Sequence, residues 1–168
     1  LASIGSDARA LAEVALADPR VRAAATVAAY VSVGTEPGTG PLLEGLRSAG
    51  KRVLLPVLRA DNDLDWGVYD GTLAPARRGL LEPGGPRLGV EAIGSADVVL
   101  VPGVAVDVDG RRLGRGGGSY DRALARALPG TWIAILVFEE EIVTSVPTDP
   151  HDRSVHAAIT PTRVIQFV

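Results

Sequence analysis

The residues with the clearest chemical potential form a glycine-rich run from Arg112 to Arg122, RLGRGGGSYDR, called the glycine loop below. Its glycines let backbone N–H groups approach an anion closely, and Arg112 and Arg115 add bidentate donors. Asp121 is a carboxylate of the kind that holds the divalent cation accompanying nucleotide phosphates. The alanine- and leucine-rich stretch that follows predicts a helix, whose N-terminus also attracts anions. The loop therefore predicts a binding site for nucleotide phosphates.

The glycine loop fits neither of the common nucleotide-binding motifs. It lacks G-x-x-x-x-G-K-[ST], and the stretch from Gly114 to Ser119 lacks the final glycine of G-x-G-x-x-G. A glycine-rich segment before a helix is often only a turn, and Asp121 could be a charge that the helix dipole favours. The residues alone leave these alternatives open.

Length and composition indicate one globular domain without cysteine chemistry. The 168 residues are 46% hydrophobic and include no cysteine, which excludes disulfides and thiolate catalysis and fits a reducing cytoplasm. The net charge of −3 gives no indication of a nucleic-acid partner. No apolar run reaches the roughly 18 residues that cross a bilayer. We therefore expect a cytoplasmic protein that binds neither nucleic acid nor membrane.

Alternating strands and helices are expected to position the glycine loop. Apolar, β-branched runs predict strands over 26–33, 52–58, 97–101, 131–138 and 163–168, with an alternating edge strand over 64–69. Helices are predicted over 7–17, 39–50 and 120–128, a long loop over 73–89, and a hairpin turn at 109–110. This order predicts an α/β fold of three layers, an open and largely parallel sheet with helices on both faces. Ligands bind such sheets beyond the carboxyl ends of the strands, where the glycine loop lies.

A longer string around the glycine loop resembles the signature of a known family. Residues 101–107 read VPGVAVD, followed by Gly110 and the loop itself. This resembles V-P-G-x-A-F-D-x-x-G-x-R-L-G-x-G-x-G-Y-Y-D, the pattern of the 5-formyltetrahydrofolate cyclo-ligases, also called 5,10-methenyltetrahydrofolate synthetases. Glu36 with Thr39, Leu55-Pro56, the run 79–83 and His151-Asp152 match further family elements. The resemblance covers nearly the whole chain.

The resemblance implies an ATP-dependent cyclisation that requires Mg²⁺. In this family the formyl oxygen of 5-formyltetrahydrofolate attacks the γ-phosphate of ATP, and the neighbouring folate nitrogen then closes the ring. The products are 5,10-methenyltetrahydrofolate, ADP and phosphate. The protein's share is positioning and charge stabilisation rather than covalent catalysis. We expect a monomer whose partner is a reduced folate.

The resemblance also implies roles for individual residues. The ATP loop would comprise Arg112, Leu113, Gly114, Arg115, Gly116, Gly117, Gly118, Ser119 and Tyr120, with Arg112, Arg115 and Tyr120 as catalytic residues. Substrate contacts are expected from Val31, Glu36, Trp66 and Ser119, and Mg²⁺ ligation from Asp121 and Asp152. Without the resemblance, Glu36 would read as a turn carboxylate, Asp152 as part of a solvated loop, and Trp66 as a core residue.

Two positions depart from the family pattern, and both concern the substrate side. Ser119 replaces the first tyrosine of Y-Y-D, and Val106 replaces the phenylalanine of A-F-D. The family also carries, upstream of the position that Leu1 matches, a helix whose lysine and arginine reach the ATP phosphates. We therefore expect residues 1–168 to form a single cyclo-ligase-like domain that lacks this N-terminal helix.

Two other functions remain open on the sequence. The first is a non-catalytic nucleotide- or folate-binding homologue that has lost part of the phosphate clamp. The second is a relative of sugar-phosphate isomerases or acyltransferases, which would not require ATP, because a fold does not fix a function.

Overall fold

A seven-stranded sheet divides the molecule in the computed structural model, which describes residues 2–147 and 153–167. The strand order is β12-β11-β9-β6-β1-β2-β3. The strands are β1 (Thr26–Ala28), β2 (Arg52–Leu58), β3 (Leu64–Val68), β6 (Val98–Val101), β9 (Trp132–Leu136), β11 (Ala157–Ile159) and β12 (Val164–Gln166). The five inner strands pair in parallel, and β3 and β12 close the two edges as antiparallel strands. The predicted open, largely parallel sheet is confirmed.

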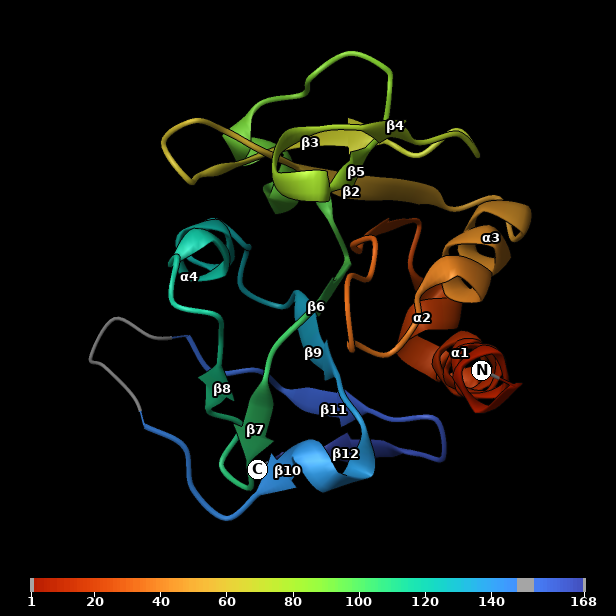
Figure 1. Ribbon diagram of the computed structural model, residues 1–168, viewed down its shortest axis with the longest axis vertical. Coiled ribbons are helices and arrows are strands. Elements are labelled where there is room, and N and C mark those ends of the chain that lie inside the picture. Colours follow the sequence, from red (N-terminus) through yellow and green to blue (C-terminus); the bar gives the residue numbers. More distant parts are fainter. Residues whose placement is uncertain (1, 148–152, 168) are drawn as a thin grey trace.

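Three helices cover one face of the sheet, α1 (Ala2–Ala17), α2 (Pro19–Ala23) and α3 (Gly40–Ser48), on the right of Figure 1. Alternate strand residues such as Leu100 and Leu136 point into this layer and are fully buried with Leu11 and Leu42. Gly45 lets α1 and α3 approach closely, because a Cβ there would clash with the Cδ1 atom of Leu16.

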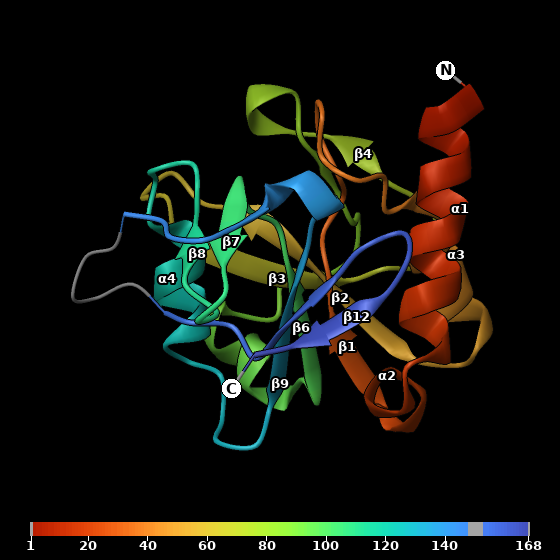
Figure 2. The ribbon, with the colours of Figure 1, turned by 90° about the horizontal axis from the view of Figure 1, so that it is seen from below.

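The other face carries a mixed layer, which Figure 2 shows on the side opposite α1. It consists of the 3₁₀ helix η2 (Val90–Ser95), the short helix α4 (Ser119–Leu124), and a small sheet of β7 (Ala105–Asp107), β8 (Arg112–Leu113) and β10 (Ile142–Val143). Val99 and Ile135 point into this layer and pack with Leu124. The three predicted layers are present, but this face is less helical than expected. The hairpin turn at 109–110 joins β7 to β8 as predicted, with Gly110 at φ 82°.

Several element boundaries differ from the prediction. The first helix begins at Ala2 rather than at residue 7, and the helix after the glycine loop ends at Leu124 rather than at 128. Strand β11 was not predicted, because three residues of sequence Ala-Ala-Ile give too little pattern. The predicted loop 73–89 contains a small hairpin of β4 (Ala74–Pro75) and β5 (Leu81–Glu82) around the 3₁₀ turn η1 (Arg77–Gly79), and a third such turn, η3, spans Glu139–Glu141.

The strand order predicts a ligand site at the centre of the sheet's carboxyl edge. Strand β1 has β2, its successor through α3, on one side and β6 on the other. The chain therefore changes direction across the sheet at β1, which is the topological switch point where α/β folds bind ligands. Within residues 2–147 and 153–167, no helix is long and apolar enough to cross a membrane.

Candidate functional site

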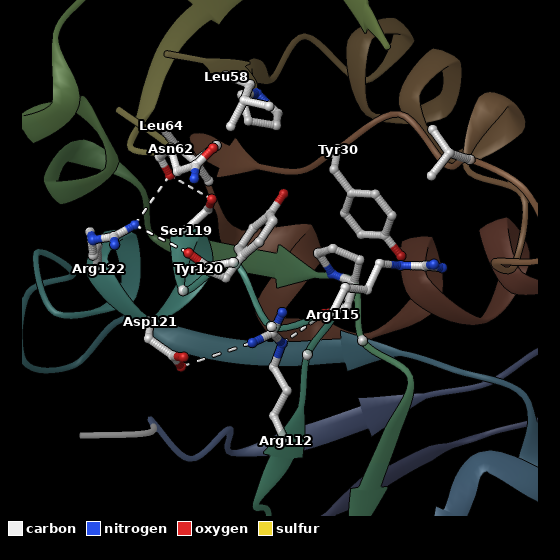
Figure 3. Close-up of a pocket in the computed structure, with 18 of the residues that line it drawn as sticks. Tyr30, Leu58, Asn62, Leu64, Arg112, Arg115, Ser119, Tyr120, Asp121 and Arg122 are labelled. Atoms are coloured by element: carbon white, nitrogen blue, oxygen red, sulfur yellow. Dashed lines mark hydrogen bonds and ion pairs between the residues drawn. The ribbon is translucent and has the colours of Figure 1, made fainter. Parts of the chain in front are cut away.

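A pocket of about 890 Å³ lies beyond the carboxyl ends of β1, β2 and β6, at this switch point (Figure 3). Its volume is in the range of small-molecule and cofactor sites, which is about 300–1,000 Å³. Five parts of the chain line it: the segment after β1 (Tyr30, Val31, Val33 and Glu36), the β2–β3 hairpin (Pro56, Leu58, Asn62 and Leu64), the hairpin around η1 (Arg78, Leu80 and Leu81), the glycine loop with Pro102 and Gly103 before it and Ala125 after it, and Pro147 with Arg153.

The segment between β1 and α3, residues 29–39, is held in shape by its own hydrogen bonds. The Thr39 hydroxyl donates to the carbonyl oxygen of Tyr30 at 2.9 Å and accepts the backbone N–H of Ser32 at 2.9 Å. The Thr39 N–H donates to the Ser32 hydroxyl at 3.0 Å. Thr39 stands at the N-cap of α3 as expected, but its side chain bonds this segment instead of capping the helix. These bonds also explain why β1 ends at Ala28 rather than at the predicted Val33.

Glu36 presents its carboxylate at the pocket from this segment. One oxygen, Oε1, accepts the backbone N–H of Val33 at 2.8 Å, which fixes the side chain and leaves Oε2 for other partners. Oε2 lies 3.5 Å from Nη2 of Arg115, which reaches across the pocket from the glycine loop. The two residues come from segments 79 positions apart in the sequence, so the fold brings the predicted substrate residue against a predicted phosphate residue.

The backbone of the glycine loop depends on two glycines with positive φ, Gly116 at 96° and Gly118 at 74°. A residue with a Cβ adopts such angles only with strain. No atom within 4 Å would meet a Cβ at Gly116, so space is left above the backbone there. Helix α4, which follows, has no side-chain capping bond but is only six residues long. The loop's own N–H groups and arginines, more than a helix dipole, therefore make this side of the pocket attractive to an anion.

Arg112 is the buried cation of the pocket, with 6% of its side chain exposed. Its Nε donates to the carbonyl oxygen of Pro102 at 2.7 Å, and its guanidinium lies 5.3 Å from the centre of the Tyr120 ring. Nη1 lies 3.9 Å from Oδ1 of Asp121. These contacts fix the planar fork of donors, and low solvent exposure strengthens its field within the pocket.

Two tyrosines stand in the pocket as neutral groups. Burial raises the pKa of Tyr120, and the positive charge of Arg112 offsets only part of that increase. Burial likewise raises the pKa of Tyr30, to which the nearby carboxylate of Glu36 adds. Both hydroxyls therefore keep their protons at neutral pH and can donate hydrogen bonds.

The β2–β3 hairpin turn holds the glycine loop from the far side. The Ser119 hydroxyl donates to the carbonyl oxygen of Asn62 at 2.5 Å, and Arg122 donates to the same oxygen at 3.3 Å. Asn62 has φ 67°, a left-handed conformation that asparagine tolerates better than most residues. Next to it, Asp63 pairs with Arg126 through bonds of 2.7 and 2.6 Å. The residue that replaces the family's tyrosine thus serves here as an anchor for the loop.

The predicted metal ligands are only partly described. Asp121 lines the pocket with 24% of its side chain exposed, and it accepts the backbone N–H of Arg153 at 3.4 Å. Asp152 lies outside the described residues. No group of three His, Cys, Asp or Glu side chains gathers within the described parts of the chain. A single carboxylate beside phosphate oxygens still suits Mg²⁺, which keeps water ligands and needs one or two protein carboxylates.

The pocket brings together most of the residues predicted from sequence. All nine residues of the predicted ATP loop line it, as do Asp121, Val31 and Glu36. Trp66 does not. It is fully buried on β3, within the core beneath the α4 layer, so the prediction that it lines the pocket is wrong. The open alternative for Trp66, a core aromatic, describes its position.

Among the aromatic residues that could line a pterin pocket, the sequence favours Trp66 over Tyr30, and no motif marks the side chains of Asn62 or Leu80 as pocket residues. Tyr30 lies within the predicted strand 26–33, so its pattern matches a core residue. Asn62 lies in the turn Ala60-Asp61-Asn62-Asp63, where polar residues favour turns and give no sign of a distant partner. Leu80 lies in the run 79–83 that matches a family element, but neither that match nor the length of its loop indicates that its side chain reaches the pocket.

Comparison with known proteins assigns this geometry to one family. Residues 3–161 match the sequence profile of the 5-formyltetrahydrofolate cyclo-ligase family. A 5-formyltetrahydrofolate cyclo-ligase of Mycolicibacterium smegmatis is 48% identical over 146 residues, which cover 83% of this chain and 75% of that protein. The Escherichia coli protein of the same name is 36% identical over 154 residues, or 89% of this chain and 85% of that one.

Solved structures show the same fold. The 5,10-methenyltetrahydrofolate synthetase of Aquifex aeolicus, determined by NMR, superposes with a TM-score of 0.78 and 26% identity, covering 95% of this chain and 82% of that one. A 5,10-methenyltetrahydrofolate synthetase from Mycoplasma pneumoniae gives a TM-score of 0.71 at 18% identity, covering 95% and 88%, and supports the fold alone.

Proposed function

The chain belongs to the 5-formyltetrahydrofolate cyclo-ligase family, and we propose that it is an enzyme converting 5-formyltetrahydrofolate to 5,10-methenyltetrahydrofolate with hydrolysis of ATP to ADP and phosphate. The observation that carries the proposal is the meeting of Glu36 and Arg115 across one pocket. One stands on the segment expected to bind folate, and the other on the loop expected to bind ATP. A reaction that joins the formyl oxygen to the γ-phosphate needs both ligands at such a boundary.

We propose that Arg112 and the backbone of the glycine loop hold the phosphate chain. Arg112 is already fixed by Pro102 and Tyr120, so little reorganisation is needed when charge shifts during phosphoryl transfer. Arg115 is more adaptable, because 59% of its side chain is exposed and its contact with Glu36 is long. It can turn from the carboxylate to a phosphate without breaking a strong bond.

On the folate side, Val31 offers an apolar contact and Glu36 offers Oε2, whose contact with Arg115 is long at 3.5 Å. A carboxylate held in place accepts hydrogen bonds from the N–H groups of a pterin ring. The apolar residues Leu58, Leu64 and Leu80 line the pocket as well and would exclude water from the activated formyl group. The neighbouring folate nitrogen then attacks the formyl carbon, and phosphate leaves with the former formyl oxygen.

We propose Asp121 and Asp152 as the carboxylates that hold Mg²⁺ beside the phosphates. Bound there, the ion would neutralise charge on the phosphate oxygens. The position of Asp121, on α4 at the end of the glycine loop and lining the pocket, supports this role.

The proposal is tested by incubating the chain with 5-formyltetrahydrofolate, ATP and Mg²⁺ while following the absorbance of the methenyl product. We expect one ADP for each methenyl group formed, and no product when a non-hydrolysable ATP analogue replaces ATP. Asp121→Asn should abolish the Mg²⁺-dependent turnover and leave the thermal unfolding transition in place. Absence of product with all three components present would contradict the enzyme, and binding without turnover in calorimetry would favour a non-catalytic homologue.

We further propose that residues 1–168 form one cyclo-ligase domain that works as a monomer in the cytoplasm. The absence of cysteine from the sequence is compatible with a reducing compartment. Sedimentation equilibrium at micromolar concentration, with and without both substrates, measures the oligomeric state, and a dimer under either condition would contradict the monomer.

A further inference from the structure

The hydroxyl of Tyr30 is buried at the pocket without a hydrogen-bond partner. The residue is only 3% exposed, and no atom in residues 2–147 or 153–167 bonds its hydroxyl oxygen. Buried hydroxyls in native proteins are nearly always paired, and an unpaired one is a reason to look for a ligand. A phenylalanine would fill the same apolar space without leaving a polar group unsatisfied.

The side chain cannot easily turn away to find another partner in the protein. The backbone carbonyl of Tyr30 accepts the hydroxyl hydrogen of Thr39, and the next residues are fixed by the bonds between Ser32 and Thr39. Figure 3 shows the ring projecting into the pocket with its hydroxyl end directed toward the side chain of Arg115. The hydroxyl is thus carried to the pocket by a rigid segment.

The chemistry of the hydroxyl is that of a neutral donor beside a carboxylate acceptor. Burial, and after it the charge of Glu36, raises the pKa of Tyr30, so the proton stays on the oxygen. Tyr30 and Glu36 belong to the same segment, which therefore presents one donor and one acceptor to a ligand. A pterin ring carries the complement, because a ring carbonyl oxygen lies next to ring and amino N–H groups.

We propose that Tyr30 determines specificity in this pocket, with its hydroxyl donating a hydrogen bond to an acceptor on the heterocycle of the bound folate. The inference rests on the proposed function and adds to it a residue that the family pattern did not supply. Tyr30 binds substrate and takes no part in phosphoryl transfer, so its contribution is equal in the ground and transition states.

The test compares Tyr30→Phe with Tyr69→Phe, a matched loss of one phenolic hydroxyl. Tyr69 donates to Glu44 at 2.5 Å and lies outside the pocket. Tyr30→Phe should raise KM for 5-formyltetrahydrofolate by about 3- to 10-fold, the effect of one neutral hydrogen bond, with kcat and KM for ATP unchanged. It should not lower the midpoint of thermal unfolding, because no bond within the protein is lost. Tyr69→Phe should show the reverse, a lower midpoint and unchanged kinetics.

An unchanged KM for folate in Tyr30→Phe would overturn the inference, as would a change confined to KM for ATP. A midpoint lowered as much as in Tyr69→Phe would show that the hydroxyl already has a partner in the free protein, which also overturns it. Failure of the proposed function is distinguishable, because the unaltered chain would then form no methenyl product.

Discussion

The two sides of the pocket are built in opposite ways. The segment 29–39 is closed by hydrogen bonds within itself, through Thr39, Ser32 and Glu36, over at most nine positions of sequence. The glycine loop is held from outside, by the carbonyl oxygens of Asn62 and Pro102. At its middle, a Cβ on Gly116 would meet no atom within 4 Å.

This difference matches what each side is proposed to bind. A heterocycle is recognised by hydrogen bonds whose positions must be fixed in advance, which a self-bonded segment provides. A triphosphate is flexible and is recognised by charge and by backbone N–H groups that settle around it, which a glycine-rich loop allows. Changes in the segment 29–39 should therefore affect folate binding, and changes in the glycine loop should affect ATP and turnover.

The largest effect is expected from Arg112→Ala. Loss of the buried guanidinium should lower kcat by about 10²- to 10³-fold, as removal of one pre-organised charge donor does in other enzymes. Folate binding, measured by calorimetry without ATP, should be unchanged. Arg112→Lys keeps the charge but loses the planar fork of donors, so its kcat should lie between that of Arg112→Ala and that of the unaltered chain. If the kcat of Arg112→Ala is within a few-fold of that of the unaltered chain, the glycine loop does not have the proposed role in turnover.

Thr39→Val tests the rigidity of the segment 29–39. The change leaves the N–H of Ser32 and the carbonyl of Tyr30 without their partner, which should cost about 1–3 kcal/mol of the free energy of unfolding. Urea titration would measure this as a lower midpoint, with KM for folate raised more than KM for ATP. Thr72→Val removes an exposed hydroxyl bonded to Asp70 and is the control, expected within about 0.5 kcal/mol of the unaltered chain. Equal effects on both KM values would contradict the separation of the two sides.

Acid should weaken the ion pair that holds the β2–β3 hairpin beside the glycine loop. The two hydrogen bonds from Arg126 lower the pKa of Asp63 to about 2 in the folded protein, below its ordinary value of 3.8. The pair therefore stabilises the fold above about pH 4, and the contribution is lost as the pH falls toward 2. We expect about 1–2 kcal/mol, after solvent screening, to disappear over this range. Asp63→Asn should flatten the plot of the free energy of unfolding against pH between about pH 4 and pH 2. If the slope of that plot does not change, Asp63 is not the source of the pH dependence.

The smallest effect is expected from Gly116→Ala. A Cβ meets no atom there, so only the strain of φ 96° opposes it, at about 1 kcal/mol. KM for ATP should rise about 5-fold and KM for folate should not change. Gly117→Ala is the matched control, since Gly117 lacks a positive φ and a Cβ would make only an ordinary contact with Ser119 at 3.8 Å. If both alanine variants raise KM for ATP equally, strain at Gly116 is not the cause.

The sequence predicts best those features that depend on neighbouring residues. The buried strands and the hairpin turn at Gly110 follow from local patterns of apolar and turn-forming residues. The glycine loop also stands out, since its glycines and arginines are adjacent in the chain. These features place the site at the carboxyl edge of the sheet before any contact is known.

The features that were missed depend on contacts between distant segments. Ser119 bonds Asn62 across 57 positions, and no local pattern connects a serine before a helix to an asparagine in a turn. Trp66 and Tyr30 are both aromatic residues at predicted strand positions and both are buried, yet Tyr30 packs on the α1–α3 side and lines the pocket, whereas Trp66 packs beneath the α4 layer and does not. Side-chain direction at the end of a strand is a tertiary property.

The burial of Trp66 gives the protein an internal fluorophore. Its indole lies in apolar surroundings on the hairpin that carries Asn62, whereas Trp132, the other tryptophan, is the first residue of β9, with Arg20 4.9 Å from the centre of its ring. Replacing Trp132 with phenylalanine would leave emission from Trp66 alone. Because Asn62 and Asp63 tie that hairpin to the glycine loop and to Arg126, stopped-flow emission after mixing with ATP would time the loop's adjustment without an attached dye.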